Sequence, residues 1–148
     1  TNNQPWTMEC MVYVVTSENF TNAPVLMYWL DNNSVADTVS VYGTAPKIDI
    51  STSGTGEPAP TTISKNVWVH VAVTFDGTNE NLWIDGVSAG SFARSIGASA
   101  TATLYIGGFT GSGAADTTEV YIDEVRVTKG VARYTATFTP PSSEFQEG

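Results

Sequence analysis

The stretch from Asn66 to Gly86 reads NVWVHVAVTFDGTNENLWIDG, and it decides the fold class of the chain. From Trp68 to Asp76, valines and a phenylalanine alternate with smaller or polar residues, which is the period of a strand with one buried face. Acidic and glycine residues at Asp76 and Asp85 mark tight turns on either side of the next apolar run. The stretch therefore predicts consecutive antiparallel strands rather than a helix.

Shorter runs of the same kind lie on both sides of this stretch. We expect further strands at residues 6–15, 25–31, 38–42, 47–50, 89–94, 104–107 and 119–128. The segment from Ser51 to Pro60, STSGTGEPAP, is rich in glycine and proline, and we predict an irregular loop that cannot join a sheet. Roughly ten to twelve short strands at this spacing indicate an all-β sandwich or jelly roll.

Length and composition fit one domain over residues 1–148, because 148 residues with 41% hydrophobic content build one core but not two. Fifteen acidic residues against six basic ones give a net charge of −9. Without a lysine or arginine stripe, nucleic acid is excluded as a partner, and without a long apolar run we expect no membrane span.

The only cysteine, Cys10, lies in the apolar run MECMVYVV, which predicts a buried, unreactive thiol. Since the chain opens on Thr1 and not on methionine, we expect it to be a piece of a longer polypeptide.

Four phrases carry a family resemblance: WVHVAVTFDG at 68–77, LWIDG at 82–86, LYIGG at 104–108 and IDEVRV at 122–127. Their order resembles that of laminin-G-like domains in the concanavalin A-like lectin/glucanase superfamily. The resemblance implies a concanavalin A-like jelly-roll sandwich of two antiparallel sheets. A strand that the family places before the opening PWTMECMVYV is missing. We therefore expect residues 138–145 to cover the open sheet edge, or a second copy of the chain to add a strand there and form a homo-oligomer.

The C-terminal stretch KGVARYTATFTPP, at residues 129–141, resembles laminin-G-like segments in tail and other virion proteins of tailed bacteriophages. This resemblance implies a virion or extracellular location. It also implies contacts with other virion domains or with further domains of the parent chain.

The carboxylates do not match a glycosidase site. Glucanases of the resembling superfamily carry E-x-D-x-x-E or E-x-D-x-E on one strand, whereas Asp123 and Glu124 are consecutive and alternation sends them to opposite faces. In a regular strand Val125 and Val127 lie on the same face as Asp123. The alternation therefore predicts that this face belongs to the core and that Asp123 has a structural role and not a catalytic one. His70 has no nucleophile motif beside it, so we predict a hydrogen-bonding role. We therefore assign no catalytic residue and predict that the chain is not an enzyme.

Calcium is the one cofactor that the loops suggest. Carboxylate and amide oxygens on loops suit this ion, and the resembling family includes calcium-binding domains. Aspartate and asparagine are also the preferred turn residues, so turn formation is the alternative explanation. The predicted metal ligands are Asp31, Asp37, Asp76 and Asp116.

Aromatic residues provide the candidate ligand site, because their rings stack on the apolar faces of pyranose sugars while amides bind the hydroxyls. Trp29, Trp68 and Trp83 lie on or at the start of predicted strands, and we assign them to the core. The predicted ligand-binding residues are Asn32, Asn33, Tyr42, Asn79 and Phe109. The sequence thus favours a non-enzymatic module that binds a glycan or another cell-surface ligand. The alternatives are an assembly or decoration domain of a phage particle, and then a glycoside hydrolase.

Overall fold

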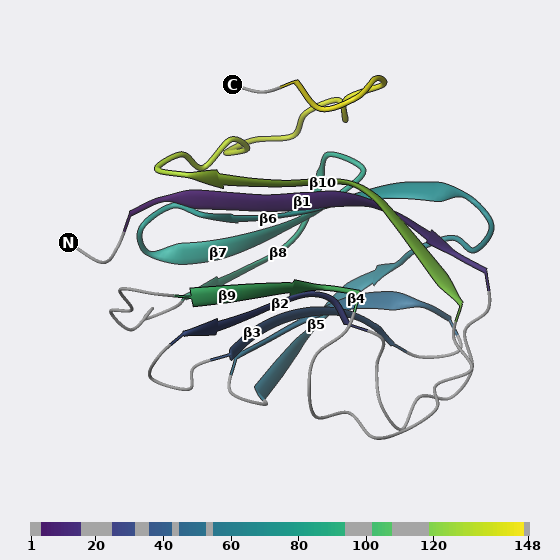
Figure 1. Cartoon of the computed structure of the whole chain (residues 1–148), viewed down its shortest axis with the longest axis horizontal. Coiled ribbons are helices and arrows are strands. Elements are labelled where there is room, and N and C mark those ends of the chain that lie inside the picture. Colours follow the sequence, from purple (N-terminus) through teal and green to yellow (C-terminus); the bar gives the residue numbers. More distant parts are fainter. Residues whose placement is uncertain are drawn as a thin grey trace.

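The computed structural model describes residues 4–15, 25–31, 36–42, 45–52, 55–93, 102–107 and 119–146. Within these ranges, ten strands form two antiparallel five-stranded sheets that face each other (Figure 1). Sheet A contains, in spatial order, β10 (Val120–Lys129), β1 (Trp6–Val14), β6 (Trp68–Phe75), β7 (Asn79–Ile84) and β8 (Val87–Ala93). Sheet B contains β5 (Thr55–Thr62), β4 (Lys47–Thr52), β3 (Ala36–Tyr42), β2 (Val25–Asp31) and β9 (Ala102–Ile106). The predicted all-β, concanavalin A-like jelly-roll sandwich is confirmed.

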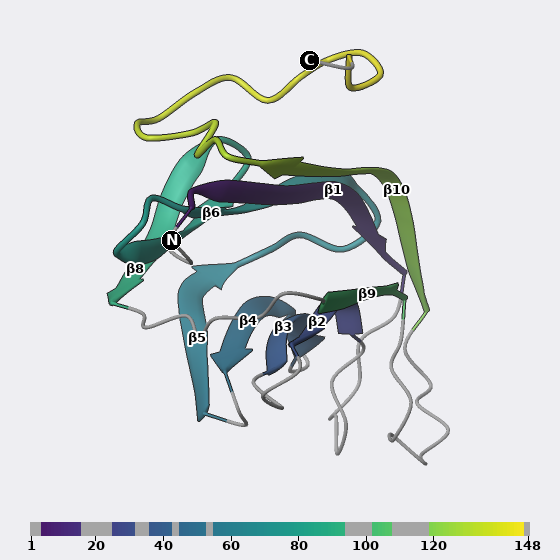
Figure 2. The same cartoon turned by 60° about the vertical axis from the view of Figure 1, so that its left-hand side comes forward.

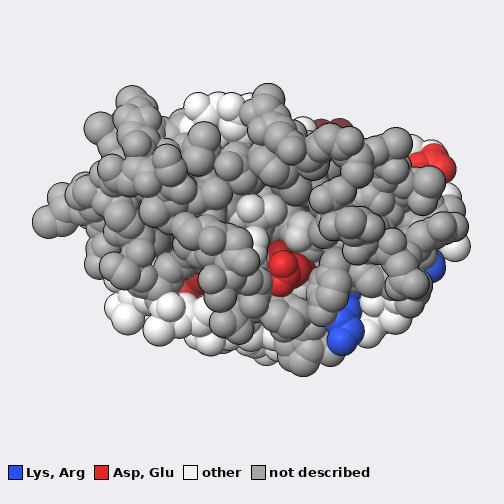
Figure 3. Space-filling view, turned by 90° about the horizontal axis from the view of Figure 1, so that it is seen from below, with Lys and Arg blue, Asp and Glu red and all other residues white. Residues whose placement is uncertain are grey.

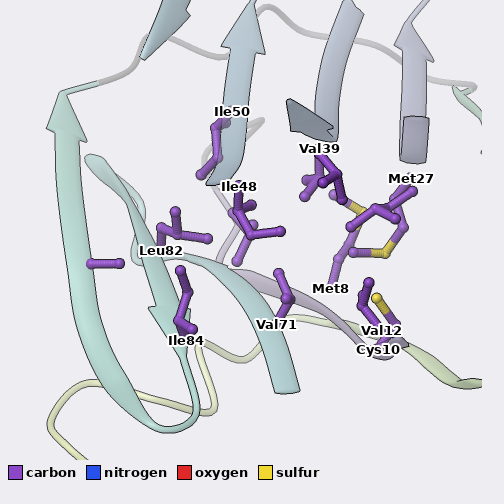
Figure 4. Packing of buried hydrophobic residues seen from close by; sticks show 14 of the residues in the cluster. Met8, Cys10, Val12, Met27, Val39, Ile48, Ile50, Val71, Leu82 and Ile84 are labelled. Atoms are coloured by element: carbon purple, nitrogen blue, oxygen red, sulfur yellow. The ribbon is translucent and has the colours of Figure 1, made fainter. Parts of the chain in front are cut away.

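The core lies between the two sheets and is built by the apolar positions that alternate along each strand. Met8, Val71 and Leu82 of sheet A point toward Met27 and Ile48 of sheet B (Figure 4). The alternation read from the sequence therefore identifies the inner faces of the central strands correctly.

Within the described residues, no helix is long and apolar enough to cross a membrane.

Cys10 lies in this core and is fully buried, as predicted. Burial raises the pKa of its thiol to about 12, with a further contribution from the negative charge of Glu9. A thiol with such a high pKa stays protonated at neutral pH, so it is a poor nucleophile and a poor metal ligand.

The predicted loop from Ser51 to Pro60 is wrong, because most of it forms β5. This strand pairs with β4 in a register that sets Pro58 opposite Asp49 and Thr62 opposite Lys47. Strand β5 is the last strand of sheet B, so only one of its two edges has to supply ladder hydrogen bonds. An edge strand tolerates a proline whose missing N–H would have faced away from the sheet.

A β-bulge interrupts the pairing of β1 with β10. The register runs from Glu9 opposite Arg126 to Met11 opposite Asp123, so β10 has an extra residue at this point. Glu124 takes a positive φ of 52° there. The bulge shifts the alternation, and Asp123 is exposed on the outer face of sheet A. The prediction that the face of Asp123 belongs to the core is therefore wrong.

The C-terminal strap, defined here as residues 131–146, crosses the outer face of sheet A on the side away from sheet B (Figures 1 and 2). The Phe138 N–H donates to the Gly86 carbonyl oxygen at 3.0 Å. A Cβ at Gly86 would lie 1.9 Å from the Phe138 carbonyl oxygen, so the strap fits this turn only because residue 86 is a glycine. The expected cover over a sheet edge is wrong, because residues 138–145 cover a face, and β10 remains the outermost strand of sheet A.

Figure 3 shows the opposite side of the molecule, from below sheet B. Acidic atoms are visible near the centre and also at the rim of this face, and basic atoms are visible toward its rim. Ser40 is buried in β3, where it pairs with Asp49 of β4.

Candidate functional site

Three aromatic residues form a row across the outer face of sheet A. Tyr13 of β1 pairs with Trp68 of β6 on one side and with Tyr121 of β10 on the other. The ring centroids lie 5.5 Å apart for Tyr13 and Trp68 and 6.0 Å apart for Tyr13 and Tyr121. Trp68 is 42% exposed and Tyr121 is 51% exposed. This aromatic row therefore presents large ring surfaces to solvent, which is unusual for residues of this size unless they bind something.

A cavity of about 320 Å³ lies beside the row, between sheet A and the strap, and we call it the Trp68 cavity. Its walls are formed by Met11, Trp68, Asp123, Glu124 and Phe145 together with residues 141–143 of the strap. The volume is at the lower end of the range of small-molecule sites in proteins. Most of the lining is apolar and includes two aromatic rings, and the carboxylates and serine hydroxyls add polar groups, so the cavity offers both stacking and hydrogen bonds.

The bulge in β10 brings both carboxylates to this cavity. Asp123 Oδ1 accepts the N–H of Glu124 at 2.8 Å, and Glu124 Oε2 accepts the N–H of Phe145 at 2.8 Å. Alternation had placed the two side chains on opposite faces, and that prediction is wrong because it did not include the bulge. Glu124 holds the strap in place and Asp123 remains exposed, so these carboxylates can shape the cavity and accept hydrogen bonds.

A buried ionic network next to the cavity fixes the strap to the sheet. Glu9 is fully buried, and its carboxylate accepts hydrogen bonds from Arg126 at 2.8 Å and from the Tyr134 hydroxyl at 2.7 Å. The His70 Nε2 lies 3.0 Å from the same carboxylate. Burial by itself would raise the pKa of Glu9, but the hydrogen bonds from His70, Tyr134 and Arg126 and the charge of Arg126 hold it below the usual range. Glu9 is therefore ionised and paired.

His70 has the hydrogen-bonding role that the sequence predicted, and its side chain is fully buried. The rings of Tyr134, Phe138 and Phe145 meet the imidazole edge-on, with centroids 5.6–6.0 Å away. Phe145 also lies under the Arg126 guanidinium, 4.4 Å from it. These contacts keep the strap in one position, so the wall that it contributes to the Trp68 cavity is rigid.

Two predicted site residues, Asp76 and Asn79, meet at the turn between β6 and β7. Asp76 Oδ1 accepts the N–H groups of Thr78 and Asn79, each at 2.8 Å, and these hydrogen bonds lower the pKa of Asp76. This is the turn chemistry that the sequence offered as the alternative to calcium. Within the described part of the chain, no group of three His, Cys, Asp or Glu residues is placed to hold a metal ion.

The other predicted site residues are not brought together by the described structure. The backbones of Asp31, Asp37 and Tyr42 lie in sheet B, on β2 and β3. Asn32, Asn33, Phe109 and Asp116 lie outside the described residues. The glycan and calcium assignments of these residues stay predictions.

The aromatic row was missed by sequence reasoning, which placed Trp68 in the core. Trp83 is buried as expected, but under the strap on the outer face and not between the sheets. A signal was available, because Tyr13, Trp68 and Tyr121 all occupy the polar-face positions of their strands, where large aromatic residues have no core to fill.

The comparisons with known proteins agree with this architecture. The family model described as the concanavalin A-like lectin/glucanases superfamily matches residues 1–133, so nearly all of the strap lies beyond it. No curated protein sequence matches the chain significantly.

Similar solved structures include the sialidase of Trypanosoma rangeli in complex with sialic acid, with a TM-score of 0.60 and 16% identity over 93% of this chain and 22% of that one. Domain 4 of an extracellular arabinanase from Geobacillus stearothermophilus, in complex with arabinotriose, has a TM-score of 0.56 and 18% identity over 91% and 65%. A marine alginate lyase from Zobellia galactanivorans has a TM-score of 0.58 and 15% identity over 85% and 62%. At these identities the likeness shows the fold alone, and the chain spans only part of each of these proteins.

Proposed function

The chain belongs to the concanavalin A-like lectin/glucanase superfamily, and from that premise we propose that it is a non-enzymatic module that binds carbohydrate. The aromatic row beside the Trp68 cavity is the observation that carries the proposal. The exposed rings of Trp68 and Tyr121, with the half-buried Tyr13 between them, stack on pyranose faces, and Asp123 with the Ser142 and Ser143 hydroxyls binds sugar hydroxyls.

The charges at the site favour a neutral glycan over an acidic one. Asp123 and Glu124 line the Trp68 cavity, and none of the residues that form its walls is a lysine or an arginine. The nearby Arg126 is paired with Glu9, and the whole chain carries a net charge of −9. A sialylated or uronate-containing sugar would bring a third carboxylate to this cavity without a cation to balance it.

The same contacts support a binding role over hydrolysis. A glycosidase uses one carboxylic acid to protonate the leaving group and a second carboxylate on the other side of the bond. Glu124 is occupied by the Phe145 N–H, and Asp123 accepts a backbone N–H of its own strand. Because Glu124 holds the strap, the pair of carboxylates needed for hydrolysis is not available at the exposed Asp123, and we assign neither carboxylate a catalytic role.

The biological setting that we propose is a virion or another extracellular protein, in which the module contacts a cell-surface glycan beside further domains of its parent chain. This setting rests on the resemblance of residues 129–141 to laminin-G-like segments of phage tail proteins. Calcium at Asp31, Asp37, Asp76 and Asp116 remains a separate proposal. It is tested by repeating the binding measurements with calcium and with a chelator.

The experiment is a titration of neutral and acidic oligosaccharides into the full chain, followed by tryptophan fluorescence and calorimetry. We expect binding of at least one neutral oligosaccharide and about a tenfold or greater loss of affinity in Trp68→Ala. Val67→Ala is the matched control, because Val67 is an exposed neighbour that does not line the cavity. Binding that is unchanged in Trp68→Ala contradicts the proposed site, and binding restricted to acidic sugars contradicts the proposed ligand class.

One observation favours assembly as a second candidate function. Strand β10 is ten residues long, lies at the edge of sheet A and, among the strands that the structure describes, pairs only with β1. A long unpaired edge is a template for strand addition from another protein or from a second copy. Light scattering that shows a discrete oligomer, lost in Val125→Lys, together with no glycan binding, would favour assembly over carbohydrate recognition.

A further inference from the structure

A second cavity, which we call the Trp83 cavity, lies under the beginning of the strap and has a volume of about 490 Å³. Sheet A contributes Asp76, Asn81, Trp83 and Ser88, and the strap contributes residues 134–137. The Trp68 cavity is formed with residues 141–143 and Phe145 of the strap, and the two cavities share no lining residue. Each can therefore be altered without touching the other.

Hydrogen bonds and stacking hold the walls of the Trp83 cavity in place. The Trp83 indole N–H donates to Thr74 Oγ1 at 2.9 Å, and the Thr74 hydroxyl donates to the Tyr134 carbonyl oxygen at 3.2 Å. The Tyr134 ring stacks on Phe138 with centroids 3.6 Å apart and an angle of 6° between the planes. A ligand entering this cavity meets rings that are already ordered, which lowers the entropic cost of binding.

The polar groups around this cavity match the hydroxyls of a sugar. The Asp76 carboxylate has a lowered pKa because it accepts two backbone N–H groups, so it is ionised at neutral pH. Asn81 supplies a carboxamide that both donates and accepts, and Ser88 and the threonines of the strap supply hydroxyls. The lining contains no lysine or arginine, so an anionic ligand would meet Asp76 without a balancing cation.

We propose that the Trp83 cavity is a second binding site, for a neutral sugar or a similar polyol. Tyr134 and the three residues after it lie beyond the last residue matched by the family model, Arg133. The strap wall of this site therefore lies outside the stretch that the family model matches. The proposal does not depend on carbohydrate binding at the aromatic row, because the two sites are built from different residues.

The test maps amide chemical shifts of the full chain during titration with a panel of neutral sugars, namely glucose, galactose, maltotriose and cellotriose. We expect shifts at Asn81 and residues 135–137. Ser88→Leu places a larger side chain at the cavity wall. We expect the affinity obtained from these shifts to fall about tenfold in this variant. Ser143→Leu, on the wall of the Trp68 cavity, is the matched control and leaves them unchanged. If Ser88→Leu disturbs the fold, Thr137→Val provides a second measurement, because it keeps the side-chain volume and removes one hydroxyl. We expect it to lower the affinity about threefold or more.

The possible results separate this proposal from the one made for the aromatic row. Shifts confined to Met11, Trp68 and Ser142 with their neighbours would overturn the second site and leave the proposed function standing. Shifts confined to the Trp83 cavity would overturn the aromatic row as the binding site and support the second site. If no sugar of the panel shifts either region, the second site is refuted for neutral sugars, and the proposed function is tested separately by the wider oligosaccharide titration.

Discussion

Both faces of sheet A bury side chains, but they do so by different means. On the inner face, Met8 and Val71 pack against sheet B in an apolar core (Figure 4). On the outer face, Glu9 and His70 are equally inaccessible, but they lie under the strap in a network of hydrogen bonds and charges. The inner face is therefore stabilised by dispersion and the hydrophobic effect, whereas the buried groups of the outer face are held by hydrogen bonds and a charge pair.

Each face also buries one glutamate, and the two are in opposite electrostatic states. Glu9 on the outer face has Arg126 and two further hydrogen-bond partners, and its pKa is lowered. Glu80 alternates with Leu82 and so faces inward, where burial raises its pKa to about 8. A buried carboxylate is stable when it is paired with a cation, and it is driven toward the neutral form when burial dominates.

The largest expected effect comes from removing the charge at the centre of the outer face. Glu9→Ala leaves the partly buried Arg126 without its partner and two hydrogen-bonding groups without their acceptor, and we expect a loss of about 3–5 kcal/mol in the free energy of unfolding. Met8→Ala on the inner face is the comparison, with an expected loss of about 2–5 kcal/mol from the cavity that it creates. Urea unfolding measures both values. A loss below about 1 kcal/mol for Glu9→Ala would show that the strap contributes little to the fold.

The second prediction uses pH to distinguish the two glutamates. In the folded chain Glu80 keeps its proton up to about pH 8, whereas an ordinary glutamate releases it near its reference pKa of 4.5. Between these values the folded state binds more protons, so the contribution of Glu80 makes the chain less stable as the pH rises. Between pH 5 and pH 8 we expect the free energy of unfolding to fall by about 2–4 kcal/mol less in Glu80→Gln than in the unchanged chain.

Unfolding curves of the chain and of Glu80→Gln at several pH values test this prediction, with the exposed Glu144→Gln as the matched control. Equal pH dependence in all three proteins would contradict it. Glu9 has the opposite sign, because its pKa is lowered on folding and its stabilisation is lost as the pH falls toward that value.

The inner face is the part of this architecture that the sequence predicts well. The alternation of Val69, Val71, Val73 and Phe75 is local, and it needs only the period of a strand to identify the buried side. The strand ends and the family resemblance can also be read from short sequence motifs, because each motif is contiguous in the chain. The strand β5 was missed because composition alone cannot tell a glycine- and proline-rich loop from an edge strand, which needs only half of its ladder bonds.

The outer face and the candidate site could not be predicted in the same way. Glu9 and His70 are 61 residues apart, and Glu9 and Tyr134 are 125 residues apart, so no local period records their contact. The bulge at Glu124 leaves no gap in the pattern, because Val125 and Val127 continue an apparent alternation. Only the register between β1 and β10 shows that Asp123 faces the same cavity as Trp68.

The third prediction tests how tightly the strap is bound to the outer face. Gly86 and Gly130 both have a positive φ, of 77° and 85°, so alanine at either position carries the same backbone strain. Only at Gly86 would the new Cβ collide with the strap, since nothing lies within 4 Å of a Cβ at Gly130. We expect Gly86→Ala to lower the free energy of unfolding by about 1–3 kcal/mol more than Gly130→Ala does. Equal losses in the two variants would mean that the strap moves away from this turn without cost.

The smallest expected effect on stability is at Trp68, whose side chain is only partly buried on the outer face. Its side chain is 42% exposed and makes its ring contact with Tyr13, so Trp68→Ala removes only part of a large apolar contact. We expect the free energy of unfolding to fall by less than about 1 kcal/mol, far less than for a core aromatic. Urea unfolding of Trp68→Ala beside Phe75→Ala, on the same strand but on the inner face, measures the contrast. If both variants lose about 3–5 kcal/mol, the aromatic row is part of the structural framework. A small loss at Trp68 together with lost sugar binding would show that this end of the face is kept for recognition and not for stability.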